Sequence, residues 1–253
     1  IKDTLFVEKI LVRDKKKYLK ILDLEFGKNN NFSKKLTDNF SDFINSDIQI
    51  VVELIGGMNP AKEYVEKSIL SGKHVVTANK EIISNNIDHL TKLAYSKNVK
   101  LRFEAAVGAG IPLIEVLIDM LEQNNISKLT GIINGTSNYI LSSMHNGNKS
   151  FDESLQEAQN LGFAESDPTN DVGGFDAKFK INILGSIAFS ERIPLESVSV
   201  KGIENLSQKD ISYAQEFGYV IKLLAVTEIK SSKIYSNVSP YLVSNMHPLA
   251  KVE

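Results

Sequence analysis

A run of acids followed by a lysine occupies residues 165–180, with the sequence ESDPTNDVGGFDAKFK. The ionisable residues of this run that could do chemistry are Glu165, Asp167, Asp171, Asp176 and Lys180. Residues 175–190 are apolar on most sides and predict a central helix, on which Asp176 lies one turn before Lys180. Because a buried ammonium is costly without a partner, Asp176 is the expected partner. The pair is either a structural ion pair or a proton-transfer lysine tuned by burial and by its carboxylate.

The other acids lie in the loop before that helix. Taken singly, each is most simply a solvated or capping residue, but together they could bind a cationic group such as a substrate ammonium. Gly173 and Gly174 support a ligand site, because glycine permits backbone conformations and close approaches that other residues resist.

A second lysine, Lys80, ends the motif TANK, where a predicted strand passes into a helix. A cation in the first helical turn opposes the helix dipole at a cost of roughly 0.3–1 kcal/mol. Lys80 is therefore either a flexible exposed side chain or one that meets an anion or a ligand oxygen at the strand's carboxyl edge.

The glycine-containing turn VGAGIPL, residues 107–113, follows a strand and opens a helix. Leu113 stands where GxGxxG has its third glycine, so a packed turn is favoured over a dinucleotide fingerprint. Glu104, just before the turn, is either a buried, partnered acid or a cation ligand helped by the turn's carbonyls. Such carbonyls suit a hard or monovalent cation better than zinc.

Two further strand-to-helix junctions carry candidate residues. In NGTSNYI, Thr136 or Ser137 is expected to cap the following helix, with or without an anionic ligand. In LVRD, Arg13 and Asp14 end the first strand. An acid there suits a ribose 2′-hydroxyl and an arginine suits a 2′-phosphate, so Arg13 with the lysines after it favours NADP. An ordinary solvated charge run is the competing interpretation.

The elements that must position these residues change in pattern near residue 108. Before it, strands alternate with helices, which predicts a parallel, doubly wound α/β sheet. The expected strands are 6–14, 48–57, 74–80 and 99–107, and the expected helices are 59–73, with Asn59 as N-cap and Gly72 at its end, and 80–98. The second half predicts helices at 111–123, 137–147, 150–162, 175–190 and 207–218 and strands at 128–134, 219–230 and 236–243. We therefore expect a nucleotide-binding domain over 1–108 and an α+β substrate domain over 109–253.

Composition excludes several classes of function. The 253 residues are 42% hydrophobic and 24% charged with a net charge of −2, so no basic surplus predicts a nucleic-acid partner. No apolar run predicts a membrane span, and Ile1 opens into mixed polar sequence without a secretory signal. Cysteine is absent, and the four histidines lack metal-binding spacing, so neither disulfides nor a zinc site is expected. The expected compartment is the cytoplasm.

Taken together and in their order along the chain, the motifs resemble those of homoserine dehydrogenase over nearly the whole sequence. They run from ILVRD through VVELIGG, GKHVVTANK, FEAAVGAGIP, GIINGTSNYIL, EAQNLGFAESDPTNDVGGFDAKFK and EFGYVIKLLAV to HPLAKVE. The resemblance implies interconversion of aspartate 4-semialdehyde and homoserine with a nicotinamide cofactor, on the route to threonine and methionine. It also implies a homodimer formed through the second domain.

The resemblance implies a role for each candidate. Lys180 and Asp176 match the catalytic lysine and aspartate, and Lys80 matches a lysine between cofactor and substrate. The substrate-side matches are Glu165, for the amino group, with Asp171, Gly135 and Thr136. The cofactor-side matches are Arg13, for the NADP phosphate, with Gly56, Gly57 and Lys80. Glu104 with the carbonyls of Val107, Ala109 and Ile111 matches a monovalent-cation site, usually assigned sodium.

The chain departs from the family in three ways. It starts after the family's first strand and GxGxxG loop, and it stops before the return of the family's chain to the nucleotide domain. Phe163 also replaces a tyrosine common before the ExDP motif. Two other interpretations stay open: an oxidoreductase for another small substrate that uses NAD or NADP, and a non-catalytic regulatory or interaction module derived from this fold.

Overall fold

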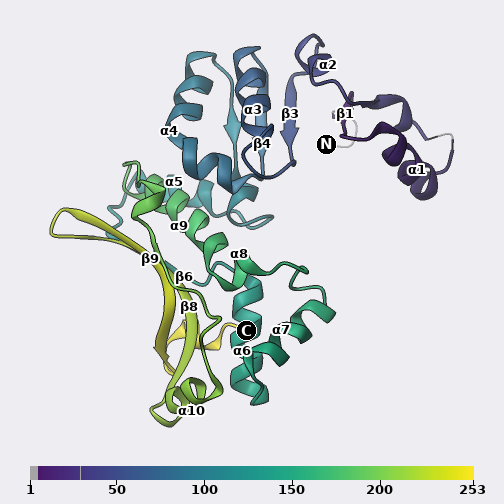
Figure 1. The fold of residues 1–253 in the computed structure, drawn as a ribbon. Coiled ribbons are helices and arrows are strands. Elements are labelled where there is room, and N and C mark those ends of the chain that lie inside the picture. The colour runs from purple at the N-terminus through teal and green to yellow at the C-terminus, as the bar shows by residue number, and fades with distance from the viewer. Residues whose placement is uncertain (1–4, 29) are drawn as a thin grey trace. The chain divides into compact units, whose positions relative to one another are not determined.

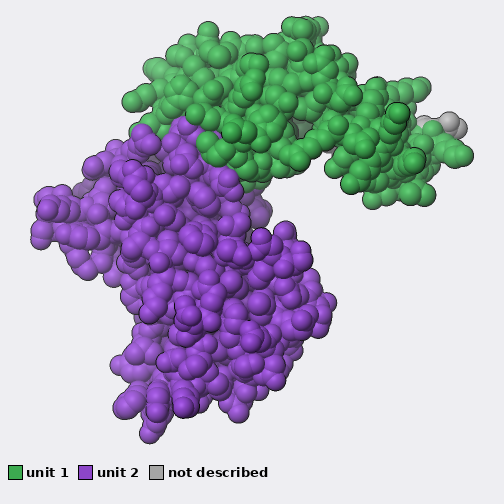
Figure 2. All heavy atoms as spheres, viewed as in Figure 1, with its two compact units in different colours: residues 1–79, 88–103 green, residues 80–87, 104–253 purple. Residues whose placement is uncertain are grey.

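The computed structural model describes residues 5–28 and 30–253. The chain divides into two compact units, coloured separately in Figure 2. Unit 1 comprises residues 1–79 and 88–103, and unit 2 comprises residues 80–87 and 104–253. Among the described residues, no helix is both long and apolar enough to cross a membrane.

Unit 1 is built on parallel strands, as the alternating pattern predicts. β1 (Ile10–Leu11) pairs with β2 (Leu36–Thr37), and a separate sheet has the order β3 (Ile50–Glu53), β4 (His74–Thr77), β5 (Leu101–Arg102). In β3, Val51 and Glu53 are buried while Ile50 and Val52 are exposed, so one face of this sheet is covered. Mixed α/β architecture with parallel sheets is thereby confirmed.

The strands at both ends of unit 1 are shorter than the predicted 6–14 and 99–107. The first must end early because Asp14 already caps α1 (Lys15–Phe26), accepting a hydrogen bond from Lys17 N at 3.0 Å. The last ends because the chain turns into η2 (Glu104–Ala106).

The two helices predicted before residue 108, 59–73 and 80–98, begin close to their predicted positions, whereas α1 and α2 (Ser41–Ile44) were not predicted. α3 (Ala61–Leu70) has Pro60 at its N-cap without a side-chain cap, so the prediction of Asn59 is wrong. Gly72 follows its end with a φ of +74°, a backbone region that glycine adopts without strain. α4 (Lys80–Ser96) starts in unit 2 and continues into unit 1, with non-helical angles at Asn86. The short elements η1 (Ser33–Lys35) and α2 complete the unit.

Unit 2 contains a four-stranded sheet with helices on one face (Figure 1). The order is β6 (Lys128–Gly131), β8 (Tyr219–Lys230), β9 (Lys233–Ser244), β7 (Ser199–Val200), antiparallel except for β7 with β9. Ser231 and Ser232, both at positive φ, form the two-residue turn of the β8–β9 hairpin.

The helices of unit 2 carry Asp171, Asp176 and Lys180 and many of its core residues. They are α5 (Ile114–Leu121), α6 (Gly135–Gly147), α7 (Phe151–Asn160), α8 (Thr169–Val172), α9 (Phe175–Ala188) and α10 (Gln208–Glu216), with η3 (Leu195–Ser197) and η4 (Pro248–Lys251). Ser207 caps α10, as expected of a serine before an amphipathic run. The prediction that 175–190 is central is confirmed, because α9 is buried over most of its length and packs on β8.

Candidate active site

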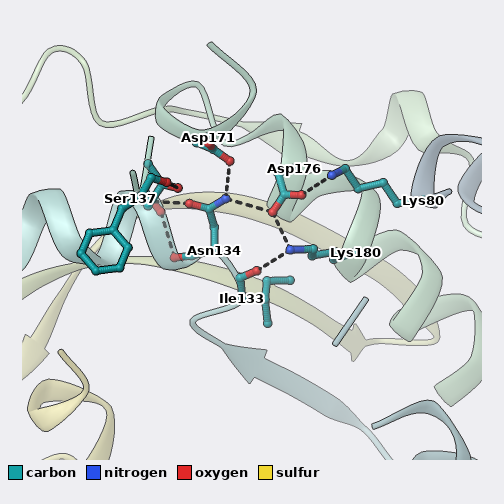
Figure 3. A network of polar contacts seen from close by, with 9 residues as sticks. Lys80, Ile133, Asn134, Ser137, Asp171, Asp176 and Lys180 are labelled. Carbon is teal, nitrogen blue, oxygen red and sulfur yellow. Dashed lines mark hydrogen bonds and ion pairs between the residues drawn. The ribbon is translucent and has the colours of Figure 1, made fainter. Parts of the chain in front are cut away.

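A buried carboxylate held between two lysines forms the centre of the site (Figure 3). Lys180 Nζ lies 2.7 Å from Asp176 Oδ2, and Lys80 Nζ lies 2.7 Å from Asp176 Oδ1. The Asp176 side chain is only 6% exposed, against 19% for Lys180 and 36% for Lys80. All three residues belong to unit 2. Each oxygen of one aspartate therefore has its own cation.

Local structure explains this arrangement. α9 starts after Gly174, and Asp176 lies in its first turn, where the helix dipole favours a negative charge. Lys180 follows one turn later, and its Nζ also donates to the carbonyl of Ile133 at 3.1 Å. Lys80 is the first residue of α4, and Asp176 offsets the dipole penalty that its position carries. The structure thus pairs both lysines, and it does not leave Lys80 as a free surface side chain.

The environment keeps Asp176 ionised. Burial alone would raise the pKa of its carboxyl. The charge of Lys180 and the hydrogen bonds from Asn134, Lys180 and Lys80 outweigh burial and hold the pKa of Asp176 below its usual range. The site therefore contains a fixed negative charge flanked by two potential proton donors.

Asn134 belongs to the same network, although the sequence did not suggest it as a site residue. Its Nδ2 donates to Asp171 Oδ1 at 2.7 Å and to Asp176 Oδ2 at 2.9 Å. Its Oδ1 accepts from Ser137 N at 2.8 Å, so Asn134 is the N-cap of α6 and the prediction of Thr136 or Ser137 as the cap is wrong. Asparagine is among the preferred N-cap residues, so the position of Asn134 directly before the helix could have indicated it as the cap.

The remaining substrate-side candidates lie on the segments that border this network. Thr136, in the first turn of α6, donates its hydroxyl to the carbonyl of Phe163 at 2.7 Å. Gly135 is the exposed first residue of that helix. Asp167 is a local capping acid, because its Oδ1 accepts from both the backbone N and the hydroxyl of Thr169.

Glu165, the candidate for the substrate's amino group, lies apart from the Asp176 network. It is exposed on the loop before α8, and its backbone carbonyl accepts from Gln159 Nε2 at 3.1 Å. Among the described residues, the hydrogen bonds and ion pairs that join Lys80, Asn134, Asp171, Asp176 and Lys180 do not include it. Its carboxylate is thus not one of the groups that the network brings together.

Glu104 caps a helix from a distance in sequence. Its Oε1 accepts from the backbone N of Leu113 and of Ile114, both at 2.6 Å, and its Oε2 accepts from Glu115 N at 3.0 Å. Burial would raise the pKa of Glu104, but these three bonds outweigh it and lower the pKa. A carboxylate oxygen with one hydrogen bond keeps a further lone pair, so Oε2 is still able to face a cation.

The other residues proposed for the cation site form the turn between Glu104 and α5. Val107 is buried, whereas Ala109, at a φ of +51°, and Ile111 are exposed. Among the described residues, no three histidine, aspartate or glutamate side chains gather as a metal cluster. Carbonyl oxygens must then supply most of the ligands of any cation bound here.

Apart from Lys80, which is in unit 2, the cofactor candidates lie in unit 1. Gly56 and Gly57 have φ values of +77° and +68°, and a Cβ built on either would meet nothing within 4 Å. Buried Glu53 shapes this turn, because its Oε1 accepts from Ile55 N at 2.7 Å and from Gly56 N at 3.3 Å. The open, side-chain-free turn at the carboxyl end of a parallel strand fits the approach of a dinucleotide.

Arg13 and Asp14 separate in role. Asp14 is committed to the N-cap of α1, whereas the Arg13 side chain is exposed just beyond β1. The sequence offered Asp14 for a ribose 2′-hydroxyl and Arg13 for a 2′-phosphate. The structure commits Asp14 to the helix cap and leaves Arg13 available to a nucleotide.

Comparison with known proteins agrees with this geometry. The family model for the NAD binding domain of homoserine dehydrogenase matches residues 3–104, and the model for homoserine dehydrogenase itself matches residues 112–253. The chain belongs to the homoserine dehydrogenase family. It is 40% identical to the homoserine dehydrogenase of Lactococcus lactis over 99% of this chain and 57% of that protein. It is 39% identical to that of Bacillus subtilis over 97% of this chain and 55% of that protein.

Solved structures of the family have the same fold. A homoserine dehydrogenase from Thiobacillus denitrificans, 42% identical, superposes with a TM-score of 0.89 over 98% of this chain and 56% of that one. A hyperthermophilic archaeal homoserine dehydrogenase in complex with NADPH, 29% identical, has a TM-score of 0.74 over 91% of this chain and 68% of that one. The chain spans about half the length of the curated relatives it matches.

Proposed function

We propose that the protein containing this chain is a homoserine dehydrogenase that interconverts aspartate 4-semialdehyde and homoserine with a nicotinamide cofactor. The observation that carries the proposal is the Lys80–Asp176–Lys180 cluster in a chain of this family. Such a cluster offers what a carbonyl reduction needs besides a hydride, namely a proton donor and a fixed positive charge.

In the direction of reduction, a nicotinamide cofactor would supply the hydride for the aldehyde carbon. Lys180 donates a proton from its ammonium group to the oxygen, which becomes the hydroxyl of homoserine. Lys80 stabilises the negative charge that develops on the same oxygen. Asp176 orients both lysines. In the reverse direction, neutral Lys180 accepts the hydroxyl proton.

The substrate's amino group needs an acidic partner. We assign this role to Glu165 with Asp171. Asn134 holds Asp171 Oδ1, and Asp171 Oδ2, which has no hydrogen bond within the part of the chain that the structure describes, can face the ligand. Gly135 and Thr136 would shape the loop that receives the substrate. We further assign the nucleotide-binding role to residues 1–108 and the substrate-binding role to residues 109–253.

We favour NADP over NAD. Arg13 is exposed at the end of β1 and can pair with a 2′-phosphate, whereas Asp14 is occupied by the N-cap of α1. Gly56 and Gly57 would let the backbone approach the cofactor. The relative solved with NADPH supports the same choice. Fluorescence titrations of the protein with NADP and with NAD compare the two affinities. Tighter binding of NAD would overturn the preference for NADP.

We also propose a monovalent cation, sodium by preference, on Glu104 Oε2 and the carbonyls of Val107, Ala109 and Ile111. A glycine-rich turn with one carboxylate supplies the hard oxygen donors that such an ion takes. A homodimer formed through residues 109–253 is proposed from the family resemblance, and light scattering of the purified protein tests it.

The deciding experiment measures NADP-dependent oxidation of homoserine by the absorbance of the reduced cofactor. It uses the longest gene product that contains this sequence, the 1–253 chain, and the variants Lys180→Ala and Lys178→Ala of the long form. Loss of a proton-transfer group typically costs about 10²–10⁴-fold in turnover, so Lys180→Ala should fall by that factor and stay folded. Lys178, on the same helix outside the network, serves as the matched control. Near-normal turnover of Lys180→Ala would refute its role.

A further inference from the structure

Asn134 is the one neutral side chain that joins both carboxylates of the network in Figure 3. It is buried, at the junction between β6 and α6. A single nitrogen, Nδ2, donates to Asp171 at 2.7 Å and to Asp176 at 2.9 Å. The two acids come from different helices, α8 and α9.

The hydrogen-bonding capacity of an asparagine matches this position fully. The amide has two N–H donors, one for each carboxylate, and its oxygen accepts the backbone N–H of Ser137. Aspartate could accept from Ser137 but could donate to neither acid. Serine could cap the helix and donate only once. Asparagine performs all three tasks without adding charge.

The bridge acts against electrostatic repulsion. Asp171 and Asp176 both lie within 3 Å of the same nitrogen, so their negative charges are close together in a partly desolvated place. Lys80 and Lys180 neutralise Asp176, but among the described residues no cation forms an ion pair with Asp171. Without the amide, the Asp171 carboxylate would repel that of Asp176 and compete with it for the ammonium groups of Lys80 and Lys180.

We propose that Asn134 is a positioning residue of the reaction: it fixes Asp176 Oδ2 beneath the Lys180 ammonium and holds Asp171 alongside, with the free oxygen of Asp171 turned to the substrate. The proposal rests on the proposed function and deepens it. Asn134 itself touches neither substrate nor cofactor in this scheme and acts through the two acids.

The main test is Asn134→Asp in the full-length protein, because it keeps the size of the side chain and the acceptor for Ser137 N but removes both donors. Misplacement of a catalytic group by about 1 Å can cost about 100-fold, so kcat for homoserine oxidation should fall by that order while KM for NADP is unchanged. Asn134→Ser, which keeps one donor and the helix cap, should lose less activity.

The pH profile separates positioning from mere folding. The charged groups facing Asp176 are Lys80 from α4, Lys180 from α9 and Asp171 from α8. The extra negative charge in Asn134→Asp stabilises the protonated form of this network, so the rising limb of homoserine oxidation should move to higher pH. Ser150→Ala removes the N-cap of α7 outside the network and should lower Tm without moving the profile.

A second readout needs no activity. The Asn134 amide favours the ionised form of Asp176, so Asn134→Ser should raise the midpoint pH of acid unfolding. That rise should shrink when Asp176 is already replaced by Asn. If both Asn134 variants keep kcat within twofold and an unchanged pH profile, the inference is overturned while the proposed function stands. If the wild type shows no nicotinamide-dependent turnover, the proposed function fails, and the acid-unfolding comparison still decides whether Asn134 holds Asp176.

Discussion

At the scale of single residues, the site depends on a carboxylate that is buried yet remains charged. Asp176 Oδ1 pairs with Lys80, and Asp176 Oδ2 pairs with Lys180 and also accepts a hydrogen bond from the Asn134 amide. A buried ion pair is weak evidence for stability, because desolvation can exceed the attraction between the charges. The arrangement is better explained by chemistry, since it holds two ammonium groups in fixed places around one acid.

The lowered pKa of Asp176 predicts how stability depends on pH. A carboxyl whose pKa is depressed on folding contributes stability that is fully present above its unfolded value, about 3.9, and is lost as pH falls through the folded value. Unfolding by urea should therefore show a decline in stability below about pH 4. Asp176→Asn should be less stable at neutral pH, because Lys180 loses its partner, and its decline in acid should be shallower. Equal acid slopes for both proteins would contradict the prediction.

Sequence alone predicted part of this site. The Asp176–Lys180 pair follows from a four-residue spacing on a helix, which is a local rule. Lys80 and Asp176 are 96 positions apart in the sequence, and Asn134 and Asp176 are 42 positions apart. No local spacing therefore reveals these two contacts. The resemblance to a family named Lys80, but neither the resemblance nor the pattern named Asn134.

At the scale of elements, two acids shape the turns that carry the ligand candidates. Glu53 holds the Gly56–Gly57 turn in unit 1, and Glu104 holds the start of α5 in unit 2. Helices and strands were predicted in kind far better than in extent, because their ends depend on such contacts. The N-cap residue of α5, Leu113, offers no side-chain cap, and the missing acceptors come from Glu104, nine residues earlier.

Replacing Glu104 tests this capping role. Glu104→Gln removes the charge at the helix N-terminus and one acceptor oxygen, which should cost about 1 kcal/mol of unfolding free energy. Glu122→Gln is the control on the same helix, because a negative charge at a C-terminus is unfavourable and its removal should not destabilise. Urea titrations compare the two variants. A Glu104→Gln protein as stable as the wild type would show that the three bonds contribute little.

Glu53→Ala tests the turn in unit 1. Two backbone N–H groups, of Ile55 and Gly56, would lose their acceptor along with the hydroxyl of Thr77. Of these donors the Thr77 hydroxyl is buried, and an unsatisfied buried donor costs about 1–3 kcal/mol, so a loss of this size is expected together with weaker binding of NADP. Glu63→Ala, which breaks an exposed ion pair with Lys67, should change stability by less than about 0.5 kcal/mol. Unchanged affinity for NADP in Glu53→Ala would separate the turn from the cofactor.

At the scale of the whole molecule, unit 2 has a hydrophobic core drawn from many elements. In unit 2 the long strand β8 is buried along most of its length, with α9 packed against it. The interior of unit 2 joins α6, α9 and the β8–β9 hairpin, which are far apart in sequence. Hydrophobic periodicity predicted these elements individually, but their order in the sheet follows from tertiary pairing that periodicity does not encode.

Gly185 in α9 offers a test of that interior. A Cβ at this position would lie 2.7 Å from Ile193 Cδ1 and 3.0 Å from Thr227 Oγ1, so neighbouring side chains must shift to admit it. Overpacking of this kind costs about 1–3 kcal/mol, and the loss should fall on unit 2. Hydrogen exchange of Gly185→Ala should therefore speed up in α9 and β8 while β3 and β4 keep their wild-type rates. Gly110→Ala, where a Cβ meets nothing within 4 Å, is the control. Equal acceleration in both units would mean that the chain unfolds as one cooperative body.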